Sequence, residues 1–189
     1  MSVLKLMLVL VLLSLSQAYN HFALTDCSSN SNSLLTINGY LLEYPIEIPG
    51  HVRVSSTVDI HRPISAGHLR LDATIQKWIV FDYFTLPCIS WVGSCSYDVC
   101  DLLSWFDDRG CPWQLESSNF PCTCPFNNGT YTLDPHPFYI PEVRGPWQWI
   151  AYGDFRVIGS LIDEDTSEEV ACYSLEFAVE IAPTSWGWW

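Results

Sequence analysis

The sequence predicts an all-β protein in which two antiparallel sheets pack face to face and disulfide bridges fix a long loop and join the two ends of the chain. Two observations lead to this prediction. Apolar and polar residues alternate with a period of two over several long stretches, which is typical of strands with one buried face. The chain also has eight cysteines, and six of them lie between positions 88 and 124, which indicates a disulfide framework.

Three stretches carry the strongest strand pattern: residues 52–60, 69–81 and 171–181. The apolar face of the second stretch consists of Leu69, Leu71, Ala73, Ile75, Ile79 and Phe81, and the alternation is broken only at Lys77 and Trp78. The third stretch has a similar face from Ala171 to Ile181. Weaker strand patterns lie at residues 35–42, 129–133, 138–140 and 155–162. An acidic turn at 163–167 joins the stretch 155–162 to the stretch 171–181 and predicts a hairpin.

A single helical pattern lies inside the cysteine-rich segment. Its apolar residues recur at i, i+3, i+4 and i+7, and they are Val99, Leu102, Leu103 and Phe106. Ser96 is the expected N-cap and Gly110 lies beyond the last turn, so the sequence predicts one short helix. Asn128 begins an Asn-X-Thr glycosylation sequon, which we expect on an exposed turn.

The first eighteen residues have the form of a secretory signal peptide. Lys5 precedes an apolar run at residues 6–13, and Ser16 and Ala18 occupy the −3 and −1 positions of a cleavage site. We therefore expect a single domain over residues 19–189 that enters the secretory pathway and resides in the lysosomal lumen or outside the cell. The oxidising compartment predicts that the even number of cysteines forms four bridges.

The chain is strongly acidic, with a formal net charge of −13 and a pI of about 4.4. This balance excludes nucleic acid as the natural partner, because binding to phosphates requires Lys and Arg. It also predicts repulsion from anionic membranes at neutral pH. The repulsion falls at endolysosomal pH, where Asp and Glu approach their reference pKa values of ~3.9 and ~4.3. The alternative is that the charge only keeps a secreted protein soluble.

No catalytic constellation is present in the sequence. The five histidines are scattered, and the Gly-X-Ser-X-Gly elbow of serine hydrolases does not occur. Asp107 and Asp108 form a carboxylate pair, but adjacent acidic residues after a helix are typical of a solvent-exposed helix end. Cys122 and Cys124 with His136 are an alternative zinc set, although the spacing is poor and the secreted context favours disulfides. We expect no enzyme, no metal site and no cofactor.

The chain is rich in aromatic residues, with nine each of Trp, Tyr and Phe. One apolar group follows Pro141 and Pro146 in a predicted loop and consists of Trp147, Trp149, Ile150 and Tyr152. Apolar side chains that a loop cannot bury predict a contact surface, and Trp is typical of a bilayer interface. The alternative is that these rings close one end of an ordinary core, and the alternative is stronger still for Trp186, Trp188 and Trp189 in the tail.

Seven short motifs extend along the chain: Leu86-Pro87-Cys88, Gly93-Ser94-Cys95, Val99-Cys100-Asp101-Leu102-Leu103, Pro121-Cys122-Thr123-Cys124-Pro125-Phe126, Gly129-Thr130-Tyr131, Ile140-Pro141 and Gly153-Asp154-Phe155-Arg156-Val157. They resemble the ganglioside activator proteins of the ML lipid-recognition superfamily, and the resemblance covers roughly residues 27–181. It implies disulfide bridges between Cys27 and Cys172, Cys88 and Cys95, Cys100 and Cys124, and Cys111 and Cys122.

The resemblance further implies an open β-cup with a hydrophobic cavity for acyl chains. Its expected lining is Leu71, Ile75, Ile79, Val157, Leu161, Leu175, Phe177 and Val179, although each of these is equally well explained as plain core. Tyr83 and Trp149 match aromatic rim positions of the family and are expected to touch a membrane first, together with Trp147, Ile150 and Tyr152.

The function implied is that of a non-enzymatic activator. Such a protein lifts a glycosphingolipid or another acyl lipid from a membrane surface and presents it to a soluble lysosomal glycosidase, here a β-hexosaminidase-like enzyme. Two alternatives remain open at this point. One is a secreted recognition protein that uses the same cup to sense lipid or assist a receptor, and the other is a rigid interaction module with a filled core.

Overall fold

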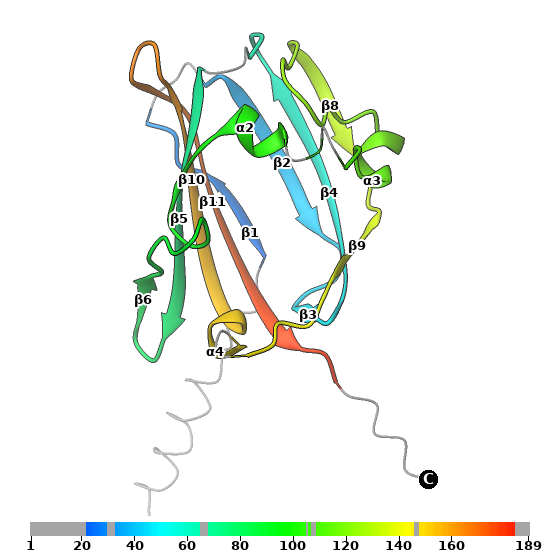
Figure 1. Ribbon diagram of the computed structural model, residues 1–189, viewed down its shortest axis with the longest axis vertical. Coiled ribbons are helices and arrows are strands. Elements are labelled where there is room, and N and C mark those ends of the chain that lie inside the picture. The colour runs from blue at the N-terminus through cyan, green and yellow to red at the C-terminus, as the bar shows by residue number, and fades with distance from the viewer. Residues whose placement is uncertain are drawn as a thin grey trace, which may run out of the picture.

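The computed structural model describes residues 22–29, 33–64, 68–104, 106, 109–145 and 148–183. The expected signal peptide lies outside these residues, as do Asp107, Asp108, Trp147 and the tryptophans of the tail. The described residues form two sheets that face each other and three short helices at their edges (Figure 1).

The larger sheet has seven strands. Its path is β1 (Ala23–Asp26), β11 (Glu168–Ile181), β10 (Gly153–Asp163), β5 (Leu69–Ile79) and β6 (Asp82–Thr85). Two short strands attach to this path: β7 (Ser96–Asp98) pairs with β5, and β3 (Ile46–Ile48) pairs with β11. All of these pairings are antiparallel except that of β3 with β11, which is parallel.

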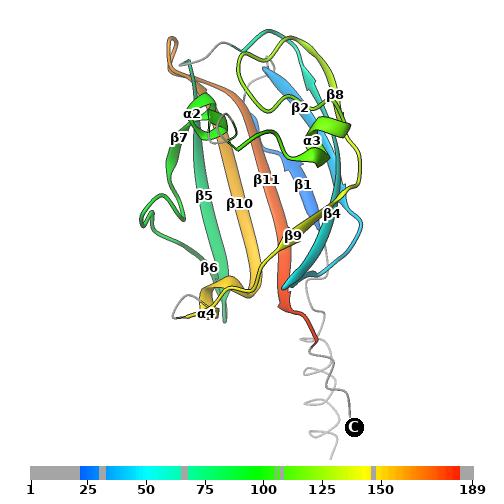
Figure 2. The same ribbon diagram turned by 45° about the vertical axis from the view of Figure 1, so that its right-hand side comes forward.

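The smaller sheet has four strands: β2 (Leu35–Leu41), β4 (Gly50–Ile60), β8 (Gly129–Leu133) and β9 (Pro137–Ile140). The long strand β4 pairs antiparallel with the other three. Figure 2 shows this sheet facing the larger one across the middle of the molecule. The predicted fold class of two sheets is confirmed.

The seven strands predicted from the alternation are all present, as β2, β4, β5, β8, β9, β10 and β11. The predicted end of the second stretch is wrong, because β5 stops at Ile79 and the chain turns at Val80, which has a φ of 59°. Phe81 therefore lies outside the strand and is 87% exposed. Lys77 does not break the alternation, since β5 is continuous and its side chain lies on the same face as Ile75.

The prediction of one short helix is also wrong, because the described residues contain three: α2 (Val99–Ser104), α3 (Trp113–Ser117) and α4 (Gln148–Ala151). The first of these is the predicted helix, but its N-cap is not Ser96, which lies in β7. Asp98 takes that role, since its carboxylate accepts a hydrogen bond from the backbone N–H of Asp101 at 2.8 Å. Helix α4 replaces the loop that was expected around Trp149.

Four disulfides are present, in the same pairs that the family resemblance implies. The bridge between Cys27 and Cys172 joins the end of β1 to β11 across a sequence separation of 145 residues. The other three connect α2 to a loop, enclose α3, and close the loop between β6 and β7. Because Cys122 and Cys124 are both in disulfides, the zinc alternative is excluded, and His136 lies 3.0 Å from the Ser117 hydroxyl instead.

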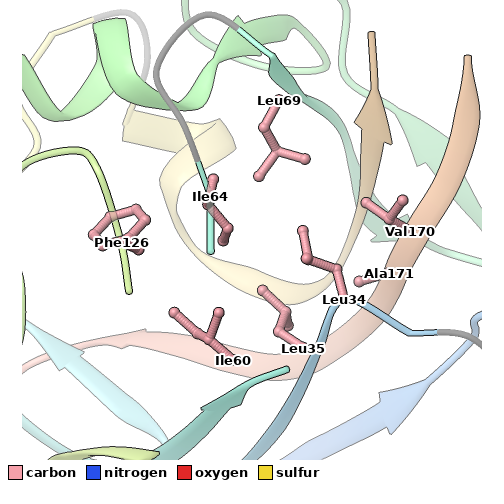
Figure 3. Close-up of a cluster of buried hydrophobic side chains, with 8 residues drawn as sticks. All are labelled: Leu34, Leu35, Ile60, Ile64, Leu69, Phe126, Val170 and Ala171. Carbon is pink, nitrogen blue, oxygen red and sulfur yellow. The ribbon is translucent and has the colours of Figure 1, made fainter. Parts of the chain in front are cut away.

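The buried side chains form two separate clusters. One cluster lies where the strands adjoin α2, and Figure 3 shows its members, which are Leu34, Leu35, Ile60, Ile64, Leu69, Phe126, Val170 and Ala171. The other lies where they adjoin α4, and it contains Ile48, Phe155 and Val179. Because β10 and β11 run through both clusters, the clusters lie at opposite ends of these strands. We call these regions the α2 end and the α4 end.

Candidate functional site

The eight residues expected to line a cavity all lie on one face of the larger sheet, the inner face. The ladder aligns Ile75 of β5 with Val157 of β10, and Val157 with Leu175 of β11. Residues two positions apart in a strand share a face. The alignment of these three residues therefore shows that the other five expected lining residues lie on the same face. Those others are Leu71 and Ile79 in β5, Leu161 in β10, and Phe177 and Val179 in β11.

Most of this inner face is only half-buried. Val179 is buried in the cluster at the α4 end, and Ile79 at the end of β5 is exposed. Leu71, Val157 and Leu175 are half-buried and belong to neither cluster. In a close-packed core such apolar side chains would be covered from above by the opposite sheet. The middle of this face is therefore accessible, although it lies between two layers of strands.

The inner face of the smaller sheet has the same character at its centre. Leu41 and Val54 are opposite each other in the β2–β4 ladder, and Phe138 is opposite Val52 in the β4–β9 ladder. Leu41, Val54 and Phe138 are half-buried and lie outside both buried clusters. Apolar surface that is not close-packed is thus present on both facing sheets.

A groove of about 830 Å³ lies beside α2 at the edge of the larger sheet. Its apolar lining comes from the helix and from the preceding hairpin, and includes Trp91, Tyr97, Leu102 and Phe106. Tyr97 is opposite Leu71 in the β5–β7 ladder, which places both side chains on the inner face. Tyr97 and Trp91 were not identified from the sequence, because β7 is too short to show an alternation.

Exposed apolar side chains gather at the α4 end. Figures 1 and 2 place α4 and the turn between β5 and β6 at this same end of the molecule. Four of these side chains are more than half exposed: Phe81, Val80 at 69%, Trp149 at 67% and Phe84 at 53%. We call these four residues the apolar rim. They lie next to the end of the inner face, at which Ile79 is also exposed.

A family model for the ML domain matches residues 21–179 of the chain. The chain belongs to the ML domain family. Its sequence is 30% identical to the ganglioside GM2 activators of Mus musculus and of Macaca fascicularis, in each case over 139 residues and 72% of this chain. These matches cover 71% and 72% of the two relatives. Among solved structures, a Niemann-Pick type C2 protein from the Japanese carpenter ant matches with a TM-score of 0.40 and 12% identity, over 84% of this chain and 99% of that one.

The rim residues expected from the sequence do not all lie together in this ML domain. Trp149 is exposed on α4, Ile150 is half-buried, and Tyr152 packs against the buried cluster of the α4 end. Tyr83 is opposite Trp78 in the β5–β6 ladder, so it lies on the outer face of the sheet. There the Arg156 guanidinium carbon is 4.0 Å from the centroid of the Tyr83 ring. Trp147 lies outside the described residues.

Among the described residues of the inner face, one is a cation, Lys77, and it is only 8% exposed. Its ammonium donates hydrogen bonds to the backbone carbonyls of Trp149 at 2.6 Å, Ile150 at 3.2 Å and Tyr152 at 2.5 Å. Burial lowers the pKa of Lys77 below its ordinary value. The sequence held a signal for this position, because Lys77 follows Ile75 and precedes Ile79 at a spacing of two.

Within the described residues no helix is long and apolar enough to cross a membrane. Nor do any three His, Cys, Asp or Glu side chains in this part of the chain form a group that could hold a metal ion. Asn128, the expected glycosylation position, is exposed immediately before β8.

Proposed function

We propose that this ML-domain protein is a lipid carrier that holds acyl chains between its two sheets. One observation carries the proposal: the apolar centre of the inner face, represented by Leu71, Val157 and Leu175, is half-buried and separate from both buried clusters. Covering an apolar surface of this kind with an apolar ligand removes it from water and lowers the free energy. The eight lining residues are those expected from the sequence.

The energetics explain why a lipid would need such a carrier. Moving a sixteen-carbon acyl chain through water exposes its methylene groups, at a cost on the order of 12 kcal/mol if each contributes ~0.8 kcal/mol. A lined interior replaces the bilayer and removes most of that cost.

The α4 end would be the part of the protein that contacts the membrane. The apolar rim is exposed there, and Trp149 is a residue type that favours the headgroup region of a bilayer. The acidic chain would be repelled by anionic lipids at neutral pH. Its pI of about 4.4 means that this repulsion largely disappears at the pH of an endolysosomal compartment. Membrane contact is therefore strongest in acid.

The finer proposal is that the lipid is a glycosphingolipid, which the protein presents to a soluble lysosomal glycosidase such as a β-hexosaminidase-like enzyme. It is supported by the 30% identity to two proteins named as ganglioside GM2 activators. In this role the protein is an activator and catalyses no reaction itself. The predicted signal peptide and the four disulfides are consistent with the secretory route that such a role requires.

The carrier proposal is tested by transfer of a fluorescently labelled glycosphingolipid between donor and acceptor vesicles, at about pH 4.5 and about pH 7. We expect transfer well above the spontaneous rate, and faster transfer in acid. Native mass spectrometry of the protein after incubation with lipid should show a one-to-one complex. Absence of both transfer and complex would leave the rigid interaction module as the interpretation.

Two neighbouring positions of β11 provide a matched pair of variants. Leu175 points to the inner face and Ser174 to the outer face, and both are half-buried. Leu175→Trp should fill the space between the sheets and abolish most of the transfer, whereas Ser174→Trp should leave transfer unchanged. Equal effects of the two substitutions would contradict the location of the lipid.

The glycosidase partner is tested separately. A soluble β-hexosaminidase is incubated with glycosphingolipid in vesicles, with and without the protein, and the released sugar is measured. We expect stimulated hydrolysis at acidic pH, and its loss in the Leu175→Trp variant. Transfer without stimulation would retain the lipid carrier but reject this enzyme class, and would favour a role in lipid sensing or receptor assistance.

A further inference from the structure

The hydrogen-bond acceptors of Lys77 all belong to one segment. They are the carbonyls of two residues in α4, Trp149 and Ile150, and of Tyr152 immediately after it. The carbonyls in the last turn of a helix have no hydrogen-bond donor within the helix. In a helix of only four residues this applies to every carbonyl. A lysine side chain is a known way to satisfy them. Lys77 thus caps the C-terminus of α4 from a neighbouring strand.

These contacts use the full capacity of the side chain. An ammonium group has three N–H donors, and Lys77 has three carbonyl acceptors within 3.2 Å. The ammonium is also 5.9 Å from the centroid of the Trp149 ring and 5.6 Å from that of Phe155. No donor remains for a ligand on the inner face. Lys77 therefore acts on its own chain and not on a bound lipid.

Burial of the Lys77 ammonium lowers the stability of the folded protein. Lys77 lies on an apolar face, and burial lowers its pKa, which shows that the charged form is disfavoured there. A methionine of similar length would avoid the desolvation cost, but it would leave the three carbonyls of the α4 segment without this donor. Because this cost opposes the gain from the hydrogen bonds, the main effect of the lysine is to fix the position of α4, and its effect on the free energy of unfolding is small.

We propose that Lys77 is a positioning residue that fixes α4, so that Trp149 is presented at the apolar rim for contact with the bilayer. The bilayer part of this inference rests on the proposed function, whereas the fixing of α4 does not. Trp149 is 67% exposed although it lies on a helix of four residues. Such a short helix is not stable by itself, so its orientation depends on contacts outside it.

The test compares the wild-type protein with Lys77→Met and Lys77→Arg. Backbone amide hydrogen exchange is measured without lipid for the segment 148–153. We expect at least about tenfold faster exchange of this segment in Lys77→Met, because the variant loses three charge-assisted hydrogen bonds and a factor of about ten corresponds to the loss of one. The melting temperature and the exchange of β11 should not change. Lys77→Arg, which retains the charge and several donors, should restore slow exchange.

Membrane contact is measured by co-sedimentation with vesicles of phosphatidylcholine containing an anionic phospholipid, at about pH 4.5. We expect Lys77→Met to lower vesicle binding to the level of Trp149→Ala, and Lys77→Arg to restore it. Arg70→Met is the control, since Arg70 lies on the same strand at the α2 end and pairs with Asp72. It should leave both measurements unchanged.

Several results would overturn the inference. Unchanged exchange in Lys77→Met would show that α4 is fixed by other contacts, and a large fall in its melting temperature would show a general structural role. Failure of Lys77→Arg to restore exchange would show that the hydrogen bonds are not the cause. If the wild-type protein does not bind vesicles, the proposed function fails, whereas the exchange measurement still decides whether Lys77 fixes α4.

Discussion

At the α2 end, eight buried side chains pack together and the bridge between Cys100 and Cys124 fastens the helix to the loop before β8. At the α4 end, the buried cluster has three members, the apolar rim is exposed, and one lysine donates hydrogen bonds to the helical segment that packs there. Covalent bonds and burial hold the first end, and reversible contacts hold the second. The difference teaches that covalent and buried contacts are concentrated at one end of the strands, whereas exposed apolar side chains gather at the other.

The largest effect is expected from the bridge that spans the whole fold. Removing it with Cys27→Ser and Cys172→Ser should lower the free energy of unfolding by about 5 kcal/mol, because the bridge closes a loop of 145 residues in the unfolded chain. Denaturant unfolding under oxidising conditions measures the loss. Cys88→Ser with Cys95→Ser, which opens a separation of only 7 residues, should cost about 2.5 kcal/mol. Equal losses would contradict the chain-entropy explanation.

The second prediction separates the packed α2 end from the accessible centre of the sheet. Leu69→Ala should destabilise the protein by about 3 kcal/mol, because this side chain is 4% exposed and lies in the larger cluster. Leu175→Ala should cost only about 1 kcal/mol, since Leu175 is half-buried and lies in neither cluster. Chemical denaturation of lipid-free protein gives both values. A loss at Leu175 as large as that at Leu69 would indicate a filled core.

The smallest effect concerns the charge of Asp154 at the α4 end. Burial raises the pKa of Asp154, so the ionised form is disfavoured in the folded state relative to the unfolded state. The penalty is present at neutral pH and disappears as the pH falls through the folded pKa. Asp154→Asn should therefore stabilise the protein at pH near 7, and this gain should shrink in acid. A gain that does not depend on pH would mean that the charge is not the cause.

The sequence predicted the long strands well because their alternation extends over many residues. It failed where elements are short: β3 and β7 have three residues each and α4 has four, too few for any period to appear. The alternation also predicted that β5 extends to Phe81, because Phe81 lies two positions after the apolar Ile79. The backbone, however, turns at Val80. A turn of this kind cannot be recognised from the alternation of apolar and polar residues alone.

The candidate site was predicted in part. The face of Val157 and Leu175 follows from the alternation, but an apolar inner face has the same pattern whether the centre is packed or open. The pairing of the cysteines required the family resemblance, because eight cysteines allow 105 pairings. Lys77 was noted only as an interruption, since a pattern of apolar residues does not show which backbone carbonyls will lie beside a lysine.

The bridge between β1 and β11 has a further consequence for a protein exposed to proteases. Cys27 and Cys172 enclose nearly all of the matched domain, so one cut of the backbone anywhere between them releases no fragment. The two pieces stay covalently joined and continue to pair strand against strand. A nicked molecule would migrate at its full mass on a gel without reductant and separate into two bands only after reduction.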